Sequence, residues 1–276
     1  MKKSCLLLIT AGMLFSCAPK KELVEVPAEI YPYDLKVEVD REFMTLAWKT
    51  HGSGLKSGYN IYISTEPLAA KYPGPFLPED IKPFNPVNFP GDTNPDDGIT
   101  YYKAEHLEEG VKYYISVRVV NTDRTLSKPT NEAIAVLGTR SEFELAFRYR
   151  SDNDGYSFAA DKSVRADAVD NDVYYYTRDG ADYLASPDRL NGFLRNSRFR
   201  ILPLKGDFEY IRNHVNRSKD EPADDRVSIK KDDWILVRTA DNTYALLHVL
   251  SFSGTGEQRT VTLFLAYSSL KNEILF

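Results

Sequence analysis

Hydrophobic and polar residues alternate along several stretches of the first half of the chain, as they do in strands that bury one face. The alternation covers residues 35–39, 44–48, 59–63 and 113–119, and glycine-containing turn segments separate some of these stretches. Short strands divided by turn signals are typical of a β-sandwich. The pattern therefore predicts a sandwich over about residues 29–138.

The second half is also rich in alternating segments. A first strand is predicted at residues 143–147, and further strands are predicted around 156–166 and 173–176. Near the end of the chain, three apolar segments separated by short turns predict an antiparallel meander. These three segments are 233–239, 243–252 and 259–267.

Two short helices are predicted between these strands. Ser186 and Pro187, followed by an acidic residue, combine a hydroxyl cap with a proline in the first turn, which predicts a helix running to about Arg195. A second helix is predicted over residues 207–216, and the charged run 217–226 is predicted to be a loop. The apolar face of the second helix consists of Phe208, Ile211 and Val215.

Composition and length agree with this pattern. The 276 residues suggest about two domains, and 18 Tyr and 14 Phe favour β-structure. A short hinge is predicted at residues 138–142. We therefore expect a mainly β protein, in which the sandwich is followed by a β-rich domain at 139–276 with one or two short helices.

Five residues of the first domain stand where a known family has its signature. Trp48 on the second strand and Tyr59 on the third are followed by the spacing Leu107-x-x-Gly110-x-x-Tyr113. In this respect the stretch resembles a fibronectin type III domain, an immunoglobulin-like β-sandwich. The resemblance implies that these residues are structural, and that the Tyr113 hydroxyl bonds to main chain at the corner before the sixth strand.

Residues 66–100 depart from that family. Eight prolines lie within this stretch, and because proline cannot donate to a sheet ladder, the stretch is not a central strand. It is interpreted as a long insertion, and loops of this length are functional or disordered more often than not. Either its aromatic residues fix the loop to the rest of the protein, or they form an exposed platform for a sugar or a protein partner. These aromatic residues are Tyr72, Phe76, Phe84 and Phe89.

The first residues of the chain resemble a bacterial lipoprotein signal. Lys2 and Lys3 precede an apolar run of roughly 11 residues that closes on Ser16 and Cys17, too short for the about 20 residues of a spanning helix. In that family the cysteine receives a diacylglyceryl group, residues 1–16 are removed, and the new amine is acylated, for example with palmitate. The resemblance implies a membrane anchor at Cys17; the alternative is an ordinary cleaved secretory signal.

An outer-membrane location is implied because Ala18, rather than an aspartate, follows the cysteine. Residues 17–28 carry two prolines and several charges, and they are interpreted as a tether. An edge strand over 23–26 is the alternative. The membrane face on which the protein is displayed, periplasmic or external, is left open.

Cysteine use and charge restrict the classes of function. Cys5 would leave with the signal and Cys17 would carry lipid, so the mature chain would have no disulfide and no thiolate metal site. Loss of Lys2 and Lys3 changes the formal charge from −5 to −7. Because nucleic acids and anionic lipids attract basic surfaces, a nucleic-acid partner is not expected.

The candidate chemistry of the second domain is sparse. An acidic cluster of Asp152, Asp154, Asp170 and Asp172 offers oxygen ligands for calcium, but it lacks the regular spacing of a calcium loop, and a solvated turn is the alternative. The sequence contains no nucleophile elbow, no phosphate loop and no pair of histidines at zinc-ligand spacing. Neither a cofactor nor a catalytic residue is assigned.

Two functions remain. The first is a non-catalytic, lipid-anchored protein of the bacterial envelope that binds a protein or glycan partner. The second is an envelope hydrolase with an acidic site in the C-terminal domain, which requires carboxylates with raised pKa values to converge in a cleft.

Overall fold

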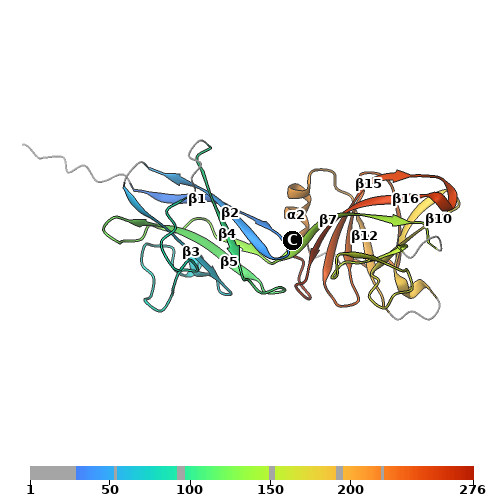
Figure 1. Cartoon of the computed structure of the whole chain (residues 1–276), viewed down its shortest axis with the longest axis horizontal. Coiled ribbons are helices and arrows are strands. Elements are labelled where there is room, and N and C mark those ends of the chain that lie inside the picture. The colour runs from blue at the N-terminus through green and yellow to red at the C-terminus, as the bar shows by residue number, and fades with distance from the viewer. Residues whose placement is uncertain (1–28, 53–54, 92–96, 149–152, 191–194, 219–220) are drawn as a thin grey trace, which may run out of the picture.

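The computed structural model describes residues 29–52, 55–91, 97–148, 153–190, 195–218 and 221–276. The protein is mainly β, as predicted, and its strands form four antiparallel sheets in two domains that lie end to end (Figure 1). Cys17, the predicted signal at 1–16 and the predicted tether at 17–28 lie outside the described residues. Within the described ranges, no helix has both the length and the apolar character needed to cross a bilayer.

The first domain consists of two three-stranded sheets. One sheet has the order β1-β2-β4, and the other has the order β3-β5-β6. Their apolar faces enclose a single core that includes the predicted residues Trp48 and Tyr59, both with no exposed surface. The strands are β1 (Tyr31–Val39), β2 (Phe43–His51), β3 (Lys56–Ser64), β4 (Ile99–Glu105), β5 (Tyr113–Asn121) and β6 (Ala133–Ala135).

The predicted corner of this sandwich is present. The amide N–H of Glu108 donates to the Tyr113 hydroxyl oxygen at 2.9 Å. Leu107 packs against the core, and Gly110 adopts a φ of +73°, which favours glycine. Trp48 and Tyr59 meet edge to face with ring centroids 5.2 Å apart. The structural roles predicted for these residues are therefore confirmed.

The second domain contains two five-stranded sheets that face each other. Their orders are β12-β14-β15-β16-β7 and β13-β11-β10-β8-β9, and a large apolar cluster fills the space between them. Single bridges, Phe147 to Tyr175 and Phe199 to Asp224, connect the two sheets. The strands are β7 (Gly138–Ala146), β8 (Gly155–Ser157), β9 (Lys162–Val164), β10 (Val173–Arg178), β11 (Ala181–Ala185), β12 (Arg198–Leu202), β13 (Arg226–Ile229), β14 (Trp234–Arg238), β15 (Tyr244–Ser253) and β16 (Thr260–Ser268).

Helix α2 (Phe208–Val215) covers the outer face of the first of these sheets. It begins at Asp207, whose carboxylate accepts the Tyr210 amide N–H at 2.9 Å, as an N-cap should. Ile211 and Val215 are buried against this sheet. The second predicted helix and the C-terminal meander are therefore confirmed. Helix α1 (Leu68–Lys71) is a single turn in the insertion of the first domain.

Two predictions of local structure are wrong, and one strand was missed. Residues 138–142 are not a hinge, because they form the first half of β7 and pair with β16 from Ser268 to Phe264. The helix predicted from Ser186 is a three-residue 3₁₀ helix, Pro187–Arg189. It ends at Leu190, whose backbone is extended. The described residues of the predicted loop 217–226 contain no helix or strand before Arg226, where β13 begins; β13 itself was not predicted.

Close contacts fix the junction of the domains. The Gly138 amide N–H donates to the Asp40 carbonyl at 3.1 Å, and a Cβ on Gly138 would collide with the Tyr267 carbonyl oxygen. Lys112 of the first domain pairs with Glu273 of the second. The Arg41 guanidinium donates to the Ala159 carbonyl at 3.0 Å.

Candidate functional site

A cleft of about 410 Å³ lies at this junction. Strands β1 and β6 of the first domain line one side, and helix α2 with Phe276 lines the other. Figure 1 shows α2 on the side of the second domain that faces the sandwich. Ligand sites are commonly concave, measure roughly 300–1,000 Å³ and occur at domain interfaces. The cleft is therefore the first candidate for a binding site.

The edge of β1 faces this cleft with main-chain groups that no strand pairs. The Asp40 amide N–H donates to the Phe43 carbonyl at 2.9 Å. Because main-chain groups alternate in direction along a strand, Lys36 and Glu38 also point their N–H and C=O groups toward β2. Val37 and Val39 consequently direct their N–H and C=O groups outward. Across the described ranges, β1 pairs only with β2, and β6 pairs only with β5.

Two polar ties close the ends of this edge. At one end, the Asn131 side-chain amide bonds to both main-chain groups of Leu35, accepting from its N–H at 2.9 Å and donating to its carbonyl at 3.0 Å. At the other end, Gly138 donates to Asp40 at 3.1 Å. The edge between the ties, from Leu35 to Asp40, measures roughly 16 Å at about 3.3 Å per residue. It is long enough for a short extended segment.

The cleft wall contributed by α2 is polar. Because Ile211 and Val215 face the sheet, Glu209, Arg212 and Asn213 lie on the opposite side and line the cleft. The Glu209 carboxylate accepts from Arg212 at 2.7 Å and from Asn213 at 3.1 Å. The buried Arg212 Nε has no hydrogen-bond partner among the described residues. This wall therefore presents a carboxylate that two neighbouring donors hold in place.

The floor and rim of the cleft are partly apolar. Ile134, on β6, is 47% exposed, and Phe276 is held in place by Asn216, whose side-chain oxygen accepts the Phe276 amide N–H at 3.0 Å. Lys36 and Glu38 add one charge of each sign from β1. A ligand in this cleft meets main-chain groups, apolar side chains and balanced charges, which is the environment of a peptide rather than of a strongly charged small molecule.

The aromatic residues of the insertion do not form one exposed platform. Phe84 and Phe89 pack against the core of the first domain, and Phe89 lies edge to face with Trp48 at 6.2 Å. Tyr72 is half-buried, and its carbonyl accepts a hydrogen bond from Arg118. Phe76 alone is largely exposed, at 85%. The other interpretation, that aromatic residues fix the loop, is confirmed for Phe84 and Phe89.

The acidic cluster is dispersed. Asp152 lies outside the described residues. Asp154 accepts the Ala166 amide at 2.6 Å, Asp170 pairs with Lys162 at 3.7 Å, and Asp172 is fully buried elsewhere. No group of three or more His, Cys, Asp or Glu side chains is placed to hold a metal ion in the part of the chain that the structure describes.

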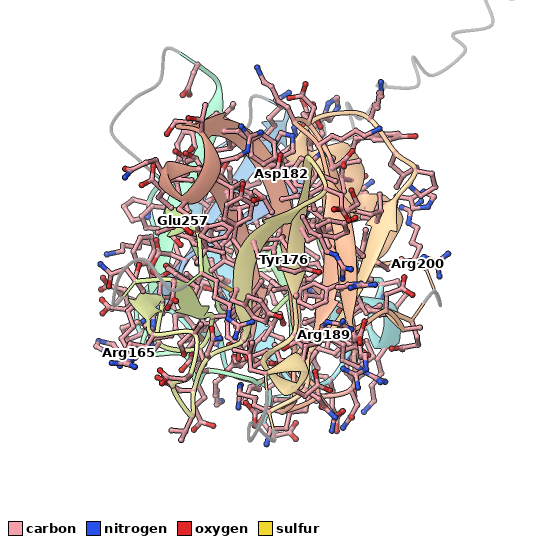
Figure 2. All side chains as sticks on the ribbon, turned by 90° about the vertical axis from the view of Figure 1, so that its right-hand side faces the viewer. Arg165, Tyr176, Asp182, Arg189, Arg200 and Glu257 are labelled. Atoms are coloured by element: carbon pink, nitrogen blue, oxygen red, sulfur yellow. The ribbon has the colours of Figure 1, made fainter. Side chains whose placement is uncertain are left out.

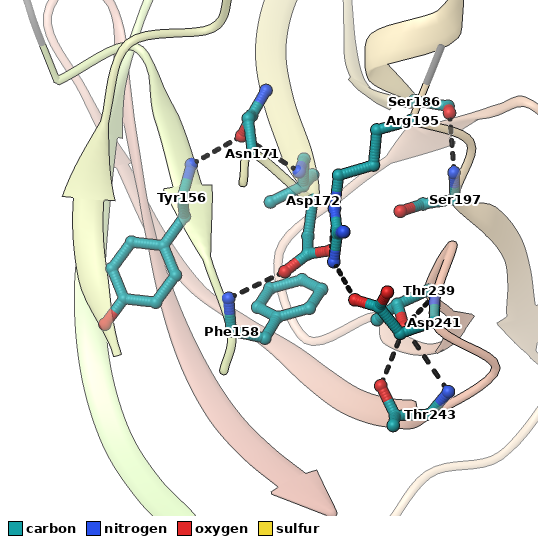
Figure 3. Close-up of polar contacts among 11 residues, drawn as sticks. Tyr156, Phe158, Asn171, Asp172, Ser186, Arg195, Ser197, Thr239, Asp241 and Thr243 are labelled. Atoms are coloured by element: carbon teal, nitrogen blue, oxygen red, sulfur yellow. Dashed lines mark hydrogen bonds and ion pairs between the residues drawn. The ribbon is translucent and has the colours of Figure 1, made fainter. Parts of the chain in front are cut away.

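Asp172 belongs to a buried ion network (Figure 3). One carboxylate oxygen accepts the Phe158 amide at 2.8 Å, and the other accepts from Arg195 at 2.7 and 3.0 Å. Arg195 also reaches Asp241 at 2.5 Å. Desolvation raises the pKa of Asp172 to about 6, although Arg195 and the Phe158 amide oppose the shift. Both oxygens are already engaged, so the network joins the start of β10 to the turn after β14.

Sequence reasoning missed the cleft. Val37 was assigned only to a strand, and for the helix at 207–216 only the apolar face was given a role. The one available signal was the amphipathic pattern of residues 207–216, which showed that Glu209, Arg212 and Asn213 share a face. What that face lies against depends on contacts between domains.

Comparisons with known proteins add little. No protein-family model matches the sequence, and no curated protein matches it. Among solved structures, the twitchin kinase region from C. elegans (Fn31-NL-kin-CRD-Ig26) is 14% identical over 88% of this chain, with a TM-score of 0.28. This chain covers 39% of that chain's length. A TM-score this low carries no argument about fold or function.

Proposed function

We propose that this chain is a non-catalytic, lipid-anchored binding protein of the bacterial envelope, and that it captures an extended peptide segment of a partner protein in the cleft. The observation that carries the binding role is the unpaired edge of β1 between its two polar ties. An extended peptide that adds to a sheet edge gains main-chain hydrogen bonds, while neighbouring pockets select its side chains. The polar face of α2 and Ile134 would provide that selection.

The anchoring part of the proposal is supported by the sequence that ends in Cys17. It is also compatible with the arrangement of the domains, because β1 begins at the end of the sandwich away from the second domain (Figure 1). A lipid at Cys17 would therefore hold the first domain closer to the membrane and the second domain farther from it.

The strand order β1-β2-β4 and β3-β5-β6 and the Tyr113 corner support a fibronectin type III-like first domain. Such a sandwich serves here as a spacer that also supplies one wall of the cleft. The hydrolase alternative has no comparable support, because the most perturbed carboxylate, Asp172, is buried and paired with Arg195.

Anchoring is tested by metabolic labelling with palmitate in a bacterial host. We expect label in the unmodified chain and none in Cys17→Ser, with the labelled form in the outer-membrane fraction. An unlabelled mature chain with a free thiol would overturn the anchor but leave the cleft proposal intact.

Peptide binding is tested on the full chain in detergent, with a displayed library of random octapeptides as the probe. We expect enriched peptides to bind at least tenfold more weakly to Val37→Pro, because proline removes the outward N–H but spares the ladder to β2. Val37→Ala, which keeps the N–H, is the matched control. Equal binding to both variants, or no enrichment, would reject strand addition.

A further inference from the structure

A second surface lies at the opposite end of the molecule from the sandwich. Figure 2 looks onto this end and shows the β10–β11 hairpin crossing the front, with Tyr176 near its centre. Val173, Tyr175 and Leu184 point into the core of the second domain, so the alternate residues of these strands point outward. On the outer face of the sheet β13-β11-β10, Tyr174 and Ala185 are buried beneath Ala166 and Leu190, and the remaining part of the face is presented to solvent.

The outward positions on this face carry no carboxylate, although acidic residues outnumber basic ones in the chain by 40 to 35. Acidic side chains occur at its margins, where Asp179 pairs with Arg178 and Asp225 pairs with Arg189. The outward residues of the three strands are Tyr174, Tyr176, Arg178, Ala181, Tyr183, Ala185, Arg226 and Ser228. The face therefore combines aromatic rings with basic groups.

The tyrosine rings form a stacked row. Tyr176 and Tyr183 are cross-strand partners, and their rings lie 5.1 Å apart at an angle of 14°. Tyr174 continues the row at 5.8 Å from Tyr176. Arginines close both ends, with Arg148 5.3 Å from the Tyr174 ring and Arg226 5.9 Å from the Tyr183 ring. Tyr176 and Tyr183 remain half-exposed.

The strands beneath this row are held rigidly. On their inner side, Tyr175 donates its hydroxyl hydrogen bond to Asp182, which also receives two hydrogen bonds of 2.7 Å from Arg259. Burial and the hydrogen bond to Asp182 raise the pKa of Tyr175, so its hydroxyl keeps its proton. A site on two strands fixed in this way needs little rearrangement to bind a ligand.

We infer that this face binds an acidic glycan. Tyr176 and Tyr183 can contact the apolar faces of sugar rings and offer hydroxyls to sugar hydroxyls, while the exposed Arg226 supplies charge-assisted hydrogen bonds to carboxylate or sulfate groups. Two stacked rings on adjacent strands, with Arg226 beside them, suit neighbouring units of a linear polymer. Its position away from the end where β1 begins leaves it accessible to polymers on the far side of the protein.

The test uses the full chain in detergent, with alginate, a linear polyuronate, as the probe and neutral dextran and polyglutamate as comparisons. We expect alginate to bind more tightly than either. Tyr176→Ala and Arg226→Gln should each weaken alginate binding at least fivefold, whereas Ser228→Ala on the same face and Val37→Pro in the cleft should leave it unchanged. Tyr176→Phe keeps the ring and should retain most of the binding.

The outcomes separate the possibilities. If polyglutamate binds as tightly as alginate and Tyr176→Ala has no effect, the face is merely electropositive and the inference is wrong. It is also wrong if alginate does not bind to the unmodified chain. Thermal unfolding of each variant shows whether the fold is intact, and if Tyr176→Ala unfolds, Tyr183→Ala and Arg226→Gln decide the question.

Discussion

Asn131 bonds to both main-chain groups of Leu35 across 96 residues of sequence, in the manner of a neighbouring strand. One short side chain thereby ties the edge of β1 to the segment that leads into β6. It also marks where the cleft begins, because beyond it the main chain of Val37 is open.

Replacing Asn131 by alanine should leave the Leu35 amide and carbonyl without partners in a half-buried place. We expect the free energy of unfolding in denaturant to fall by about 1–3 kcal/mol. Asn131→Asp keeps an acceptor for the Leu35 N–H but loses the donor. Its free energy of unfolding should therefore lie between those of the unmodified protein and Asn131→Ala. An unchanged stability of Asn131→Ala would show that the tie does not hold the edge.

The Tyr113 hydroxyl accepts the Glu108 amide at the corner before β5. Tyr113→Phe keeps the buried ring and removes this acceptor, so we expect a loss of about 1 kcal/mol in the free energy of unfolding. Tyr33→Phe, at a tyrosine that is 42% exposed, is the control and should change stability little. Equal effects of the two substitutions would contradict the corner's role.

Arg118 is 1% exposed, and its guanidinium donates to the carbonyls of Tyr72, Gly74 and Ser127. Burial lowers the pKa of this group, but it stays charged at neutral pH. Arg118→Met should leave three carbonyls without their hydrogen-bond donor and lower the free energy of unfolding by about 3 kcal/mol. It should also expose the insertion to protease.

The rate of limited proteolysis within residues 66–91 measures that exposure. Lys82→Met changes an exposed basic residue of the same segment and should leave the cleavage rate as it is. If Arg118→Met were cleaved no faster than Lys82→Met, the packing of Phe84 and Phe89 alone would hold the insertion.

The raised pKa of Asp172, about 6, makes this residue a source of pH-dependent stability. Because the folded state holds the proton more tightly than an unfolded aspartate with a pKa of about 3.9, this group stabilises the fold at low pH and loses that contribution as pH rises through 6. The contribution of Asp172 to the free energy of unfolding should decrease by about 2 kcal/mol from pH 4 to pH 7. Arg195, Asp241 and Tyr267 are the ionisable groups that interact with it.

Unfolding curves of the unmodified protein and Asp172→Asn at both pH values measure this decrease as the change in their stability difference. Asp170→Asn, at a half-buried neighbour that pairs with Lys162, is the control. A stability difference that does not change with pH would mean that Asp172 titrates as an ordinary carboxyl group.

Much of the fold was predictable because its signals are local. The apolar segments that became β14, β15 and β16 are bounded by short turns, and Asp207 followed by an amphipathic segment specified α2. The family resemblance carried by Leu107, Gly110 and Tyr113 implied a corner that depends on seven residues of contiguous chain. In each case the contacts that decide the structure lie within one element or one turn.

Where local signals conflict with tertiary pairing, the predictions failed. Gly138 and its polar neighbours suggest a hinge, yet β16 supplies a partner for every one of these residues. Asp225 and the charges before β13 suggest solvent, yet β11 pairs with that strand. Tyr183 was overlooked because β11 is short and follows a turn, so the tyrosine row was not visible in the sequence.

The sequence by itself determined the fold class, the Cys17 motif and the burial of Trp48 and Tyr59, because each depends on periodicity or on neighbouring residues. Only the tertiary structure decided that Phe84 and Phe89 pack against the core, that Val37 and α2 line one cleft, and that Tyr176 meets Tyr183. Those relationships join segments through sheet pairing and domain packing, and the energy of such contacts depends on which surfaces meet rather than on which residues are adjacent in the chain.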